Sequence, residues 1–377
     1  MIRKSIGLLA GMLVTVAVYA AGAQLRADHP DTYTVRKGDT LWGISARFLS
    51  KPWLWPEIWQ ANPQVQNPHL IYPGDVLNLS FINGGPRLTL QPRVHAEDDA
   101  VPAIPLDKLR LFLKEMRVVD SNVASSLPYV MGFEEADLRG TVGKNIYVRK
   151  LDAQPGQRFA IVRPTQVFRQ FNGKAGRDNG ADLVAHPLDA DASMVRSPWS
   201  EDFRNDGHYG RGEDLGVELS VIGTAEVLRT GDPSTLLLLD STMEIRKGDR
   251  LMPIDDKPYD PYYYPHAPKQ IPGNARVIAF TSEAYDAVGP RQVVALNIGT
   301  QDGVENGQTY SIFQPGEDIP DDVAHNSWDR GTGRYVTLPD EFVGHVMVFR
   351  TFDRVSYGLI MDGLRPVHRG DKLQMPE

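Results

Sequence analysis

The sequence predicts an α+β protein that is mainly β, with a small β-α-α-β module near the amino end and a β-rich remainder. Glycine and proline together make up 62 of the 377 residues, which favours turns and short strands over a helical bundle. Residues 32–80 pass from strand-like to helix-like periodicity and back. Two later segments share short motifs that recur in the same order, so we expect a barrel or sandwich built from two duplicated units.

Composition excludes several classes of protein. Hydrophobic residues make up 41% and charged residues 23% of the chain, as in globular proteins. The formal net charge of −8 argues against general binding of nucleic acid, which needs clustered excess lysine and arginine. Cysteine is absent, which removes disulfide scaffolds, thiolate metal sites and cysteine nucleophiles.

Residues 1–23 have the order of parts found in a secretory signal peptide. The basic residues Arg3 and Lys4 precede an uncharged, largely apolar run over 6–20, and an A-x-A pattern follows at 21–23. An uncleaved anchor is the alternative, but a membrane span needs about 20 apolar residues and this run is shorter. We therefore expect an exported protein with no membrane span after cleavage.

The first strand and turn of the module are predicted from residue types. Residues 33–35 are strand-like, and residues 36–40 form a turn that leads into a helix. Gly38 suits a positive φ, and Asp39 is placed to cap the amino end of the helix.

Two helices and a closing strand follow. Apolar residues recur every three or four positions over 41–48 and again over 55–59, so each segment should present one apolar face. The second helix can begin at Pro52 and should end near Asn62. Residues 76–79 alternate as a closing strand.

This stretch resembles the LysM family of glycan-binding modules over its whole length. The positions that carry the resemblance are Tyr33, Val35, Gly38, Asp39, Thr40, Leu41, Ile44, Phe48, Asn62, Pro73, Gly74, Leu77 and Leu79. The resemblance implies binding of N-acetylglucosamine polymers such as peptidoglycan, in a groove between the first turn and the loop before the last strand. The implied glycan-binding residues are Gly38, Asp39, Thr40 and Leu41 on one side and His69, Leu70, Ile71 and Tyr72 on the other.

An N-acetyl group suits such a groove chemically. It offers one amide donor, one carbonyl acceptor and one methyl group, while a helix amino end presents free N–H groups and a loop presents carbonyls. Because no charge is needed, we expect binding to survive moderate salt.

The second helix is richer in tryptophan than the usual family pattern. Trp55 and Trp59, four apart, are expected to fill the core rather than stack on sugar. Trp53 lies off that face and is a candidate stacking surface. Asp39 has two interpretations, as a helix cap or as a direct sugar contact.

Two segments of the remainder repeat each other. Residues 223–232 and 344–353 share Gly, Val, Arg, Thr and Asp at five of ten positions. We therefore predict two copies of one β unit, with Val227 and Val348 at equivalent buried positions. Further pairs in the same order are 155–161 with 306–312 and 246–251 with 368–373.

Each copy carries a polar insertion at the matching place, 165–216 in the first and 316–341 in the second. The first insertion lacks the regularly spaced oxygen ligands of a calcium loop, so no metal site is expected there.

Residues 253–272, between the copies, are rich in proline and tyrosine. They are interpreted either as a linker or as a pre-extended docking surface, since these residues give contact area at low entropy cost. Tyr262, Tyr263 and Tyr264 are the candidate partner-binding residues.

Catalytic constellations are missing from the sequence. The nine histidines form no H-x-H or H-E-x-x-H pattern, and G-x-S-x-G and S-x-x-K are absent. The 48 acidic residues leave the carboxylate pair of a glycosidase open, because only the fold can place such a pair. We expect a protein without enzymatic activity, metal or cofactor.

Nearly everything after residue 30 resembles the secretin-associated protein family of type IV pilus systems (TsaP-like). Besides the tryptophan-rich module, the residues that carry it are Tyr263 to Pro268, Asn297 to Gly303, Asn306-Gly307-Gln308 and Arg369 to Leu373. The resemblance implies a periplasmic protein that holds an outer-membrane secretin, the pore through which pili emerge, to peptidoglycan. The alternatives are a periplasmic glycan-cleaving enzyme with a LysM targeting module and a general envelope scaffold.

The expected division of the chain is a signal peptide at 1–23, a LysM module at 32–81, a Pro-containing linker at 82–105, a helical or irregular connector at 106–139, a first β repeat at 140–254 with its insertion at 165–216, a Pro/Tyr linker at 255–274 and a second β repeat at 275–377.

Overall fold

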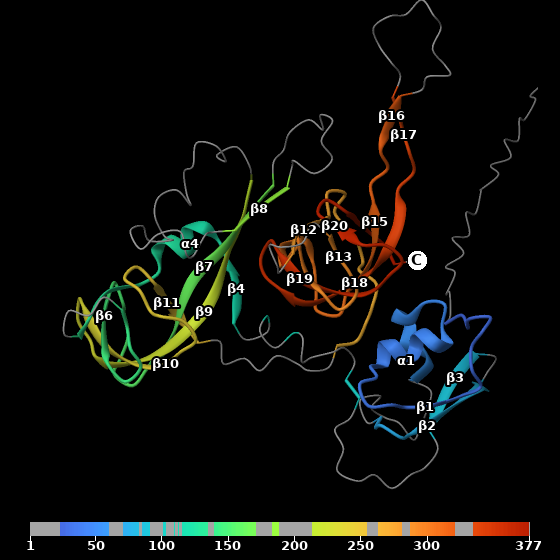
Figure 1. Ribbon diagram of the computed structural model, residues 1–377, viewed down its shortest axis with the longest axis horizontal. Coiled ribbons are helices and arrows are strands. Elements are labelled where there is room, and N and C mark those ends of the chain that lie inside the picture. The colour runs from blue at the N-terminus through green and yellow to red at the C-terminus, as the bar shows by residue number, and fades with distance from the viewer. Residues whose placement is uncertain are drawn as a thin grey trace, which may run out of the picture.

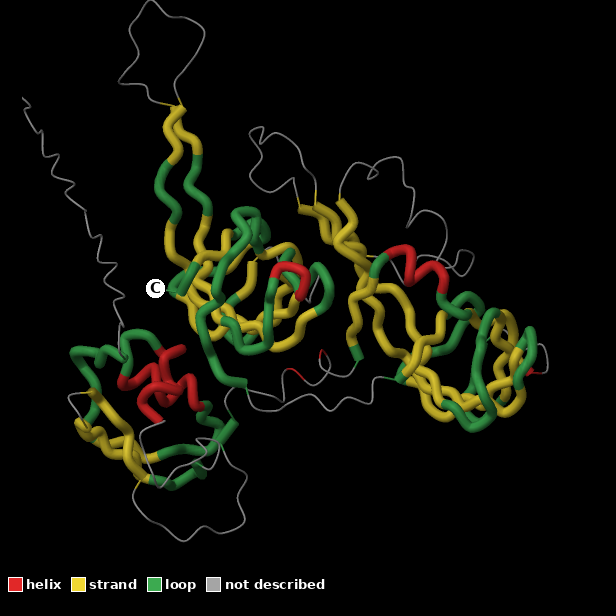
Figure 2. Tube along the Cα trace, turned by 180° about the vertical axis from the view of Figure 1, so that it is seen from behind, coloured by secondary structure: helices red, strands yellow, loops and turns green. Residues whose placement is uncertain are grey.

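The computed structural model contains a small module with short helices and two β units (Figure 1; Figure 2). The expected signal peptide lies outside the described residues, except for Ala23. No helix in the described part of the chain is long and apolar enough to cross a membrane. The structure describes residues 23–59, 71–82, 85–90, 101–102, 109, 112, 115–134, 139–170, 183–187, 213–254, 263–280, 287–320 and 335–376.

The module is an antiparallel three-stranded sheet covered on one face by helices. Its elements are β1 (Thr32–Thr34), α1 (Leu41–Phe48), the 3₁₀ helix η1 (Pro52–Leu54), α2 (Trp55–Trp59), β2 (Val76–Ile82) and β3 (Gly85–Leu90). The prediction that Trp55 and Trp59 fill the core is confirmed, since both are fully buried. Trp53 is half-buried against the same cluster.

β3 corrects the expectation that residues 82–105 are a linker. β3 pairs with β2, and its Leu88 is fully buried with Leu77 in the core of the module. Proline in this stretch concealed the strand, but β3 lies at the edge of the sheet, where Pro86 is tolerated.

The first β unit is a curved sheet whose strands form a closed ring. Its elements are β4 (Met116–Val119), α4 (Ser121–Ser126), β5 (Tyr129–Phe133), β6 (Asn145–Arg149), β7 (Arg158–Gln170), β8 (Leu183–Pro187), β9 (Glu213–Arg229), β10 (Ser234–Ser241) and β11 (Arg250–Pro253). The ring arises because the sheet order β9-β10-β6-β5-β11-β7 is closed by a second pairing of β7 with β9.

The expected connector at 106–139 therefore belongs largely to the first unit. It contributes β4, α4 and β5, and β5 is one strand of the ring. Within this stretch, Leu109 and Phe112 are helical, and Met116 begins β4.

The second β unit has the same ring order. Its strands are β12 (Val277–Phe280), β13 (Ala287–Val288), β14 (Val293–Leu296), β15 (Thr309–Gln314), β16 (Asp318–Pro320), β17 (Tyr335–Thr337), β18 (Glu341–Thr351), β19 (Ser356–Gly363), β20 (Val367–His368) and β21 (Lys372–Gln374), with a 3₁₀ turn η3 at Thr300–Asp302. The order β14-β19-β18-β15-β21 corresponds to β6-β10-β9-β7-β11 of the first unit.

Backbone hydrogen bonds correspond as well as strand order. The Val227 carbonyl accepts the Gly156 N–H, and the Val227 N–H donates to the Gln157 carbonyl. In the same way, the Val348 carbonyl accepts the Gly307 N–H, and the Val348 N–H donates to the Gln308 carbonyl. Both valines are buried. A second matching set joins the last turn of each unit to β5 in the first unit and to β12 in the second: Gly248 donates to Val130 and Val130 to Asp249, while Gly370 donates to Val277 and Val277 to Asp371.

The last turn of each unit is closed by its aspartate. Asp249 Oδ2 accepts the Arg246 N–H at 2.7 Å, and Asp371 Oδ2 accepts the His368 N–H at 2.8 Å. The glycine before each aspartate has a φ near +90°. In both turns glycine permits the tight backbone conformation and aspartate accepts a nearby amide.

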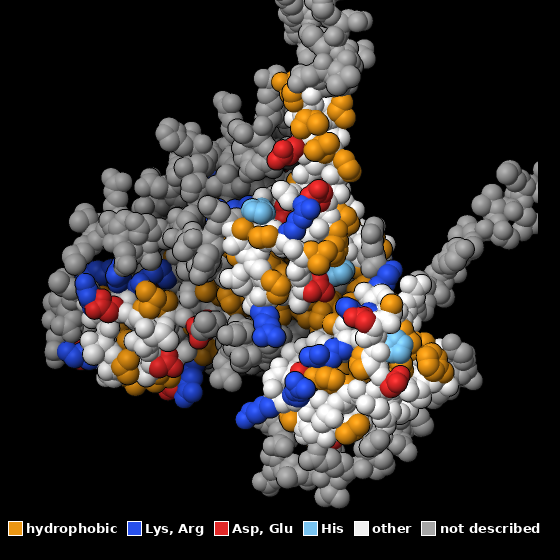
Figure 3. Space-filling view, turned by 45° about the vertical axis from the view of Figure 1, so that its right-hand side comes forward, with side chains coloured by type: hydrophobic (Ala, Val, Ile, Leu, Met, Phe, Trp, Pro, Cys, Tyr) orange, Lys and Arg blue, Asp and Glu red, His pale blue; other side chains and the backbone are white. Residues whose placement is uncertain are grey.

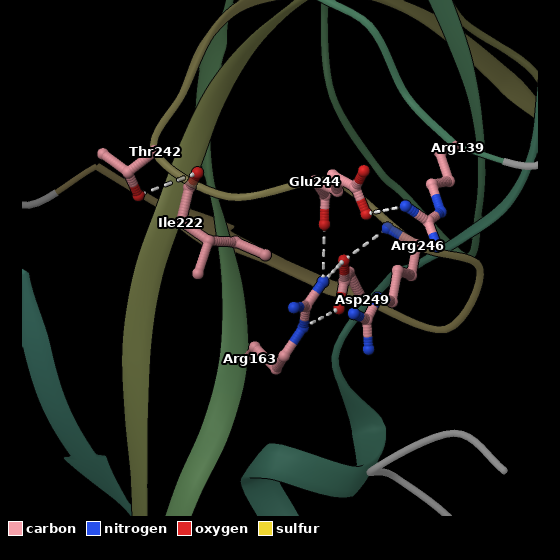
Figure 4. A network of polar contacts seen from close by, with 7 residues as sticks. All are labelled: Arg139, Arg163, Ile222, Thr242, Glu244, Arg246 and Asp249. Carbon is pink, nitrogen blue, oxygen red and sulfur yellow. Dashed lines mark hydrogen bonds and ion pairs between the residues drawn. The ribbon is translucent and has the colours of Figure 1, made fainter. Parts of the chain in front are cut away.

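A buried ion pair distinguishes the first unit from the second (Figure 4). Arg163 Nε and Nη2 donate to the two carboxylate oxygens of Asp249 at 2.9 and 2.7 Å, and Nη2 also donates to the Glu244 carbonyl at 2.8 Å. The side chains of the pair are 3% and 1% exposed. Burial raises the pKa of Asp249, and Arg163 opposes that rise.

The second unit has no arginine at the equivalent position. Ile161 pairs with Leu251 in the first unit, and Ile312 pairs with Leu373 in the second. Arg163 follows Ile161 by two positions and Gln314 follows Ile312 by two positions, so Gln314 is the counterpart of Arg163. Burial raises the pKa of Asp371 to about 6.

The two units share an apolar interface. Tyr357 on β19 donates its hydroxyl hydrogen to the carboxylate of Glu218 on β9, which also accepts from Thr165 at 2.5 Å. Glu218 is 6% exposed, and its burial raises its pKa above 4.5. The buried apolar residues around this contact are Leu109, Val118, Phe168 and Leu215 from one side and Ile278, Ala279, Val293, Ala295, Met347, Phe349, Val355 and Leu359 from the other.

Candidate functional site

The first wall of the candidate site is the turn at residues 36–39. Gly38 has a φ of +89°, a conformation that side-chain-bearing residues rarely adopt. Asp39 Oδ2 accepts the Arg36 N–H at 2.7 Å and the Tyr33 hydroxyl at 2.9 Å. The carboxylate therefore ties the turn to the end of β1.

The adjoining helix end is capped by Thr40, not by Asp39. Thr40 Oγ1 accepts the Gly43 N–H at 3.1 Å. The expectation that Asp39 caps α1 is wrong, because its carboxylate folds back onto its own turn. Leu41 is the first residue of α1, so its N–H has no acceptor within the helix and needs one outside it.

The second wall is the turn from Tyr72 to Asp75. Gly74 has a φ of +90°, and the buried Asp75 accepts the Tyr72 N–H at 2.9 Å. The Gly74 N–H donates to the Val35 carbonyl at 2.7 Å, and the Val35 N–H donates to the Asp75 carbonyl at 2.8 Å. These bonds hold the two walls side by side.

A segment of the chain itself lies between the walls. We call residues 101–102 the strap. The Val101 N–H donates to the Ile71 carbonyl at 2.6 Å, and the Leu41 N–H donates to the Pro102 carbonyl at 3.1 Å. Val101 is 4% exposed, and Leu41 and Ile71 are fully buried in the same apolar cluster.

Residues 33–80 match the LysM domain family. They are a LysM domain. The uncharacterized protein YqbP of Bacillus subtilis (strain 168) is 37% identical to this chain over 60 residues, which cover 13% of this chain and 27% of that protein. The LysM domain implies binding of glycan, peptidoglycan included.

Six of the eight predicted glycan-binding residues are described, and they lie on the two walls. Gly38 and Asp39 belong to the first wall, and Thr40 and Leu41 continue it into α1. Tyr72 belongs to the second wall, and Ile71 directly precedes it. His69 and Leu70 lie outside the described residues. Sequence reasoning missed the strap, whose only signal is a short apolar stretch, A-V-P-A-I-P, after a polar one.

The candidate partner-binding tyrosines have three different positions. Tyr262 lies outside the described residues. Tyr263 is 4% exposed in the cluster between the two β units, which corrects the expectation that it is a surface residue. Tyr264 is 45% exposed, and its ring centroid lies 5.7 Å from that of Trp55. The segment is partly built into the fold, because His266 bridges to Gln308 at the start of β15.

The LysM domain contacts the second β unit through aromatic side chains. Trp42 on α1 and His345 on β18 form an edge-on pair with ring centroids 6.3 Å apart, and Tyr264 meets Trp55 on α2. Met361 packs against the core of the domain. The packing role expected of Trp55 and Trp59 thus extends to Trp42, which sequence reasoning left unassigned.

The second insertion contains an exposed two-stranded arm, β16 paired with β17 (Figure 1; Figure 3). Ile319 stands directly opposite Val336, and both are exposed, at 41% and 49%. Tyr335 and Leu338 are exposed beside them, at 57% and 42%. An exposed cross-strand apolar pair on a projecting arm is a candidate interaction site.

The described residues hold no group of three or more histidine, aspartate or glutamate side chains that could bind a metal ion.

Proposed function

We propose that this protein is a non-catalytic periplasmic peptidoglycan-binding protein that anchors an outer-membrane secretin of a type IV pilus system to the cell wall. The observation that carries the glycan-binding half is the LysM domain with its two joined walls. Between these walls one backbone donor, the Leu41 N–H, and one backbone acceptor, the Ile71 carbonyl, are available to a ligand that displaces the strap.

An acetamido group matches these two groups. Its carbonyl accepts one hydrogen bond, its N–H donates one, and its methyl group needs apolar surroundings such as Leu41 and Ile71 provide. Since both protein groups are neutral, the expected ligand is an N-acetylated sugar polymer rather than a charged one.

The glycan-binding half is tested by sedimentation with purified peptidoglycan. The mature chain is expected to sediment at low and at physiological salt, and a chain that lacks residues 23–102 should stay in the supernatant. Loss of sedimentation at physiological salt would reject a neutral groove.

The anchoring half of the proposal is supported by the resemblance of the chain after residue 30 and by the exposed arm. The apolar pair Ile319 and Val336 is exposed and lies outside every core cluster of the described residues. A partner that covers the arm would bury this pair.

Co-purification of the secretin from envelope extract tests the anchoring half. The double substitution Ile319→Asp and Val336→Asp should abolish co-purification and leave sedimentation with peptidoglycan unchanged. The matched control is Val123→Asp, which places the same change on an equally exposed valine of α4. If the control and the double variant lose the secretin equally, the arm is not the interface.

A zymogram on purified peptidoglycan tests the non-catalytic part of the proposal. No clearing is expected from the mature chain. Clearing would replace the anchor with a glycan-cleaving enzyme.

We also propose that the two β units arose by duplication. The support is the identical order of five strands and the matching backbone bonds at Val227 and Val348. Further support comes from Gly223 and Gly344, where an added Cβ would lie 2.6 Å from the Asp240 carbonyl and 2.2 Å from that of Asp362. Both units therefore need glycine at the same point of the hairpin.

A further inference from the structure

We propose that the strap is an autoinhibitory pseudo-ligand of the LysM domain: residues 101–102 occupy the groove and must leave before an N-acetylated glycan can bind. This inference rests on the proposed glycan binding, and it adds a closed state to it.

The strap uses the same backbone groups that the sugar needs. The Leu41 N–H can donate to only one well-aligned acceptor, and that acceptor is the Pro102 carbonyl. The Ile71 carbonyl already accepts the Val101 N–H at 2.6 Å. An acetamido group therefore competes with the strap for both walls at once.

The strap also fills the apolar part of the groove. Val101 is 4% exposed and packs in the cluster that contains Leu41 and Ile71. A valine side chain buried in this cluster occupies the apolar surroundings that the acetyl methyl group would need. The strap thus matches the ligand in its donor, its acceptor and its apolar group.

Covalent connection favours the closed state. Val101 follows Leu90, the last residue of β3, by only eleven positions. A ligand tethered by so short a segment acts at an effective concentration on the order of millimolar, so a single free sugar competes poorly. A polymer that engages several LysM domains together can overcome such competition.

The test compares variants of the full mature chain in binding a tetramer of N-acetylglucosamine, measured by calorimetric titration. Val101→Asp places a charge in the apolar groove, which should release the strap because burial of an unpaired charge is costly. If the strap is closed in about nine of ten molecules, its release lowers the apparent Kd about tenfold. Val123→Asp, the same change on an exposed site of α4, should leave the Kd unchanged.

Hydrogen exchange at the Leu41 amide provides a readout that does not depend on sugar. The amide should be protected in the wild-type chain and exchange faster in Val101→Asp, because its acceptor has left. If Val101→Asp fails to fold, Val101→Ala serves instead and should tighten binding by a smaller factor.

The outcomes separate this inference from the proposed function. Equal sugar affinity of the wild-type chain and the released variant would overturn autoinhibition and leave glycan binding standing. Weaker binding by the variant would also overturn it, since the strap would then support the groove. If neither chain binds sugar while the Leu41 amide is deprotected in the variant, the glycan proposal fails, and autoinhibition fails with it.

Discussion

Arg163→Gln should destabilise the first β unit strongly and in a pH-dependent way. The substitution copies the second unit, in which Gln314 stands at the equivalent position. It removes the arginine that donates to both carboxylate oxygens of Asp249 and leaves that carboxylate buried, at 1% exposure.

The magnitude follows from the burial of the pair. Removal of one partner from a buried ion pair costs about 3–5 kcal/mol, because the remaining charge has no compensation. Arg163 opposes the rise of the Asp249 pKa that burial causes, so without it the folded-state pKa rises further above its ordinary value of 3.8. When the folded-state pKa of an acid is raised, the free energy of unfolding is highest below the ordinary pKa. It falls as pH rises from the ordinary pKa through the folded-state pKa.

Urea unfolding at pH 5 and pH 8, followed by far-ultraviolet circular dichroism, measures the effect. Since a chain of several parts need not unfold in one step, exchange of the Gly248 amide, which donates to Val130, reports the first unit separately. The loss should be larger at pH 8 than at pH 5.

The matched control is Arg158→Gln on the same strand. Arg158 pairs with Glu226 at 3.0 Å, but its side chain is 63% exposed. Exposed pairs contribute about 0–1 kcal/mol, so this variant should resemble the wild-type chain at both pH values. If Arg163→Gln loses no more stability than Arg158→Gln at pH 8, the buried pair does not stabilise the unit as argued.

Three further predictions concern single side chains. Thr40→Ala removes the α1 cap and should lower the stability of the LysM domain by about 1 kcal/mol, measured by tryptophan fluorescence during thermal unfolding, with Ser as the conservative control. Glu218→Gln should stabilise the chain increasingly as pH rises above 4.5, because the raised folded-state pKa of Glu218 costs stability there; a pH-independent difference in melting temperature would contradict this. In the wild-type chain the raised pKa of Asp371 should cost about 3 kcal/mol of stability, lost between pH 3.8 and about 6. Asp371→Asn should remove this loss, and urea titrations across that range that coincide for both chains would refute the prediction.

The sequence predicted the LysM domain well because its signals are local. Gly38 and Gly74 mark turns that need a positive φ, and the spacing of Trp55 and Trp59 marks one buried helix face. The same local reasoning chose the wrong cap, since Asp39 and Thr40 both suit that role. The choice between them depends on the Tyr33 hydroxyl, which draws the Asp39 carboxylate to β1.

Features that depend on distant parts of the chain could not be predicted. Tyr263 is a candidate docking residue because tyrosine and proline give contact area at low entropy cost, yet a cluster formed by both units buries it. The buried Glu218 shows no sequence signal either, since its partner Tyr357 lies 139 positions away. The short apolar stretch at 100–105 does not by itself reveal that residues 101–102 fold back between the walls of the LysM domain.

In the proposed anchor, the proposed autoinhibition by the strap would have a mechanical consequence. The strap lies after the LysM domain and before both β units, so a force that separates wall from partner passes through it. Two backbone bonds hold it to Leu41 and Ile71, while the LysM domain meets the second unit through Trp42 and His345. Separation of these parts would draw the strap out of the groove and expose the sugar site. In the proposed anchor, the grip on the wall would then increase under load.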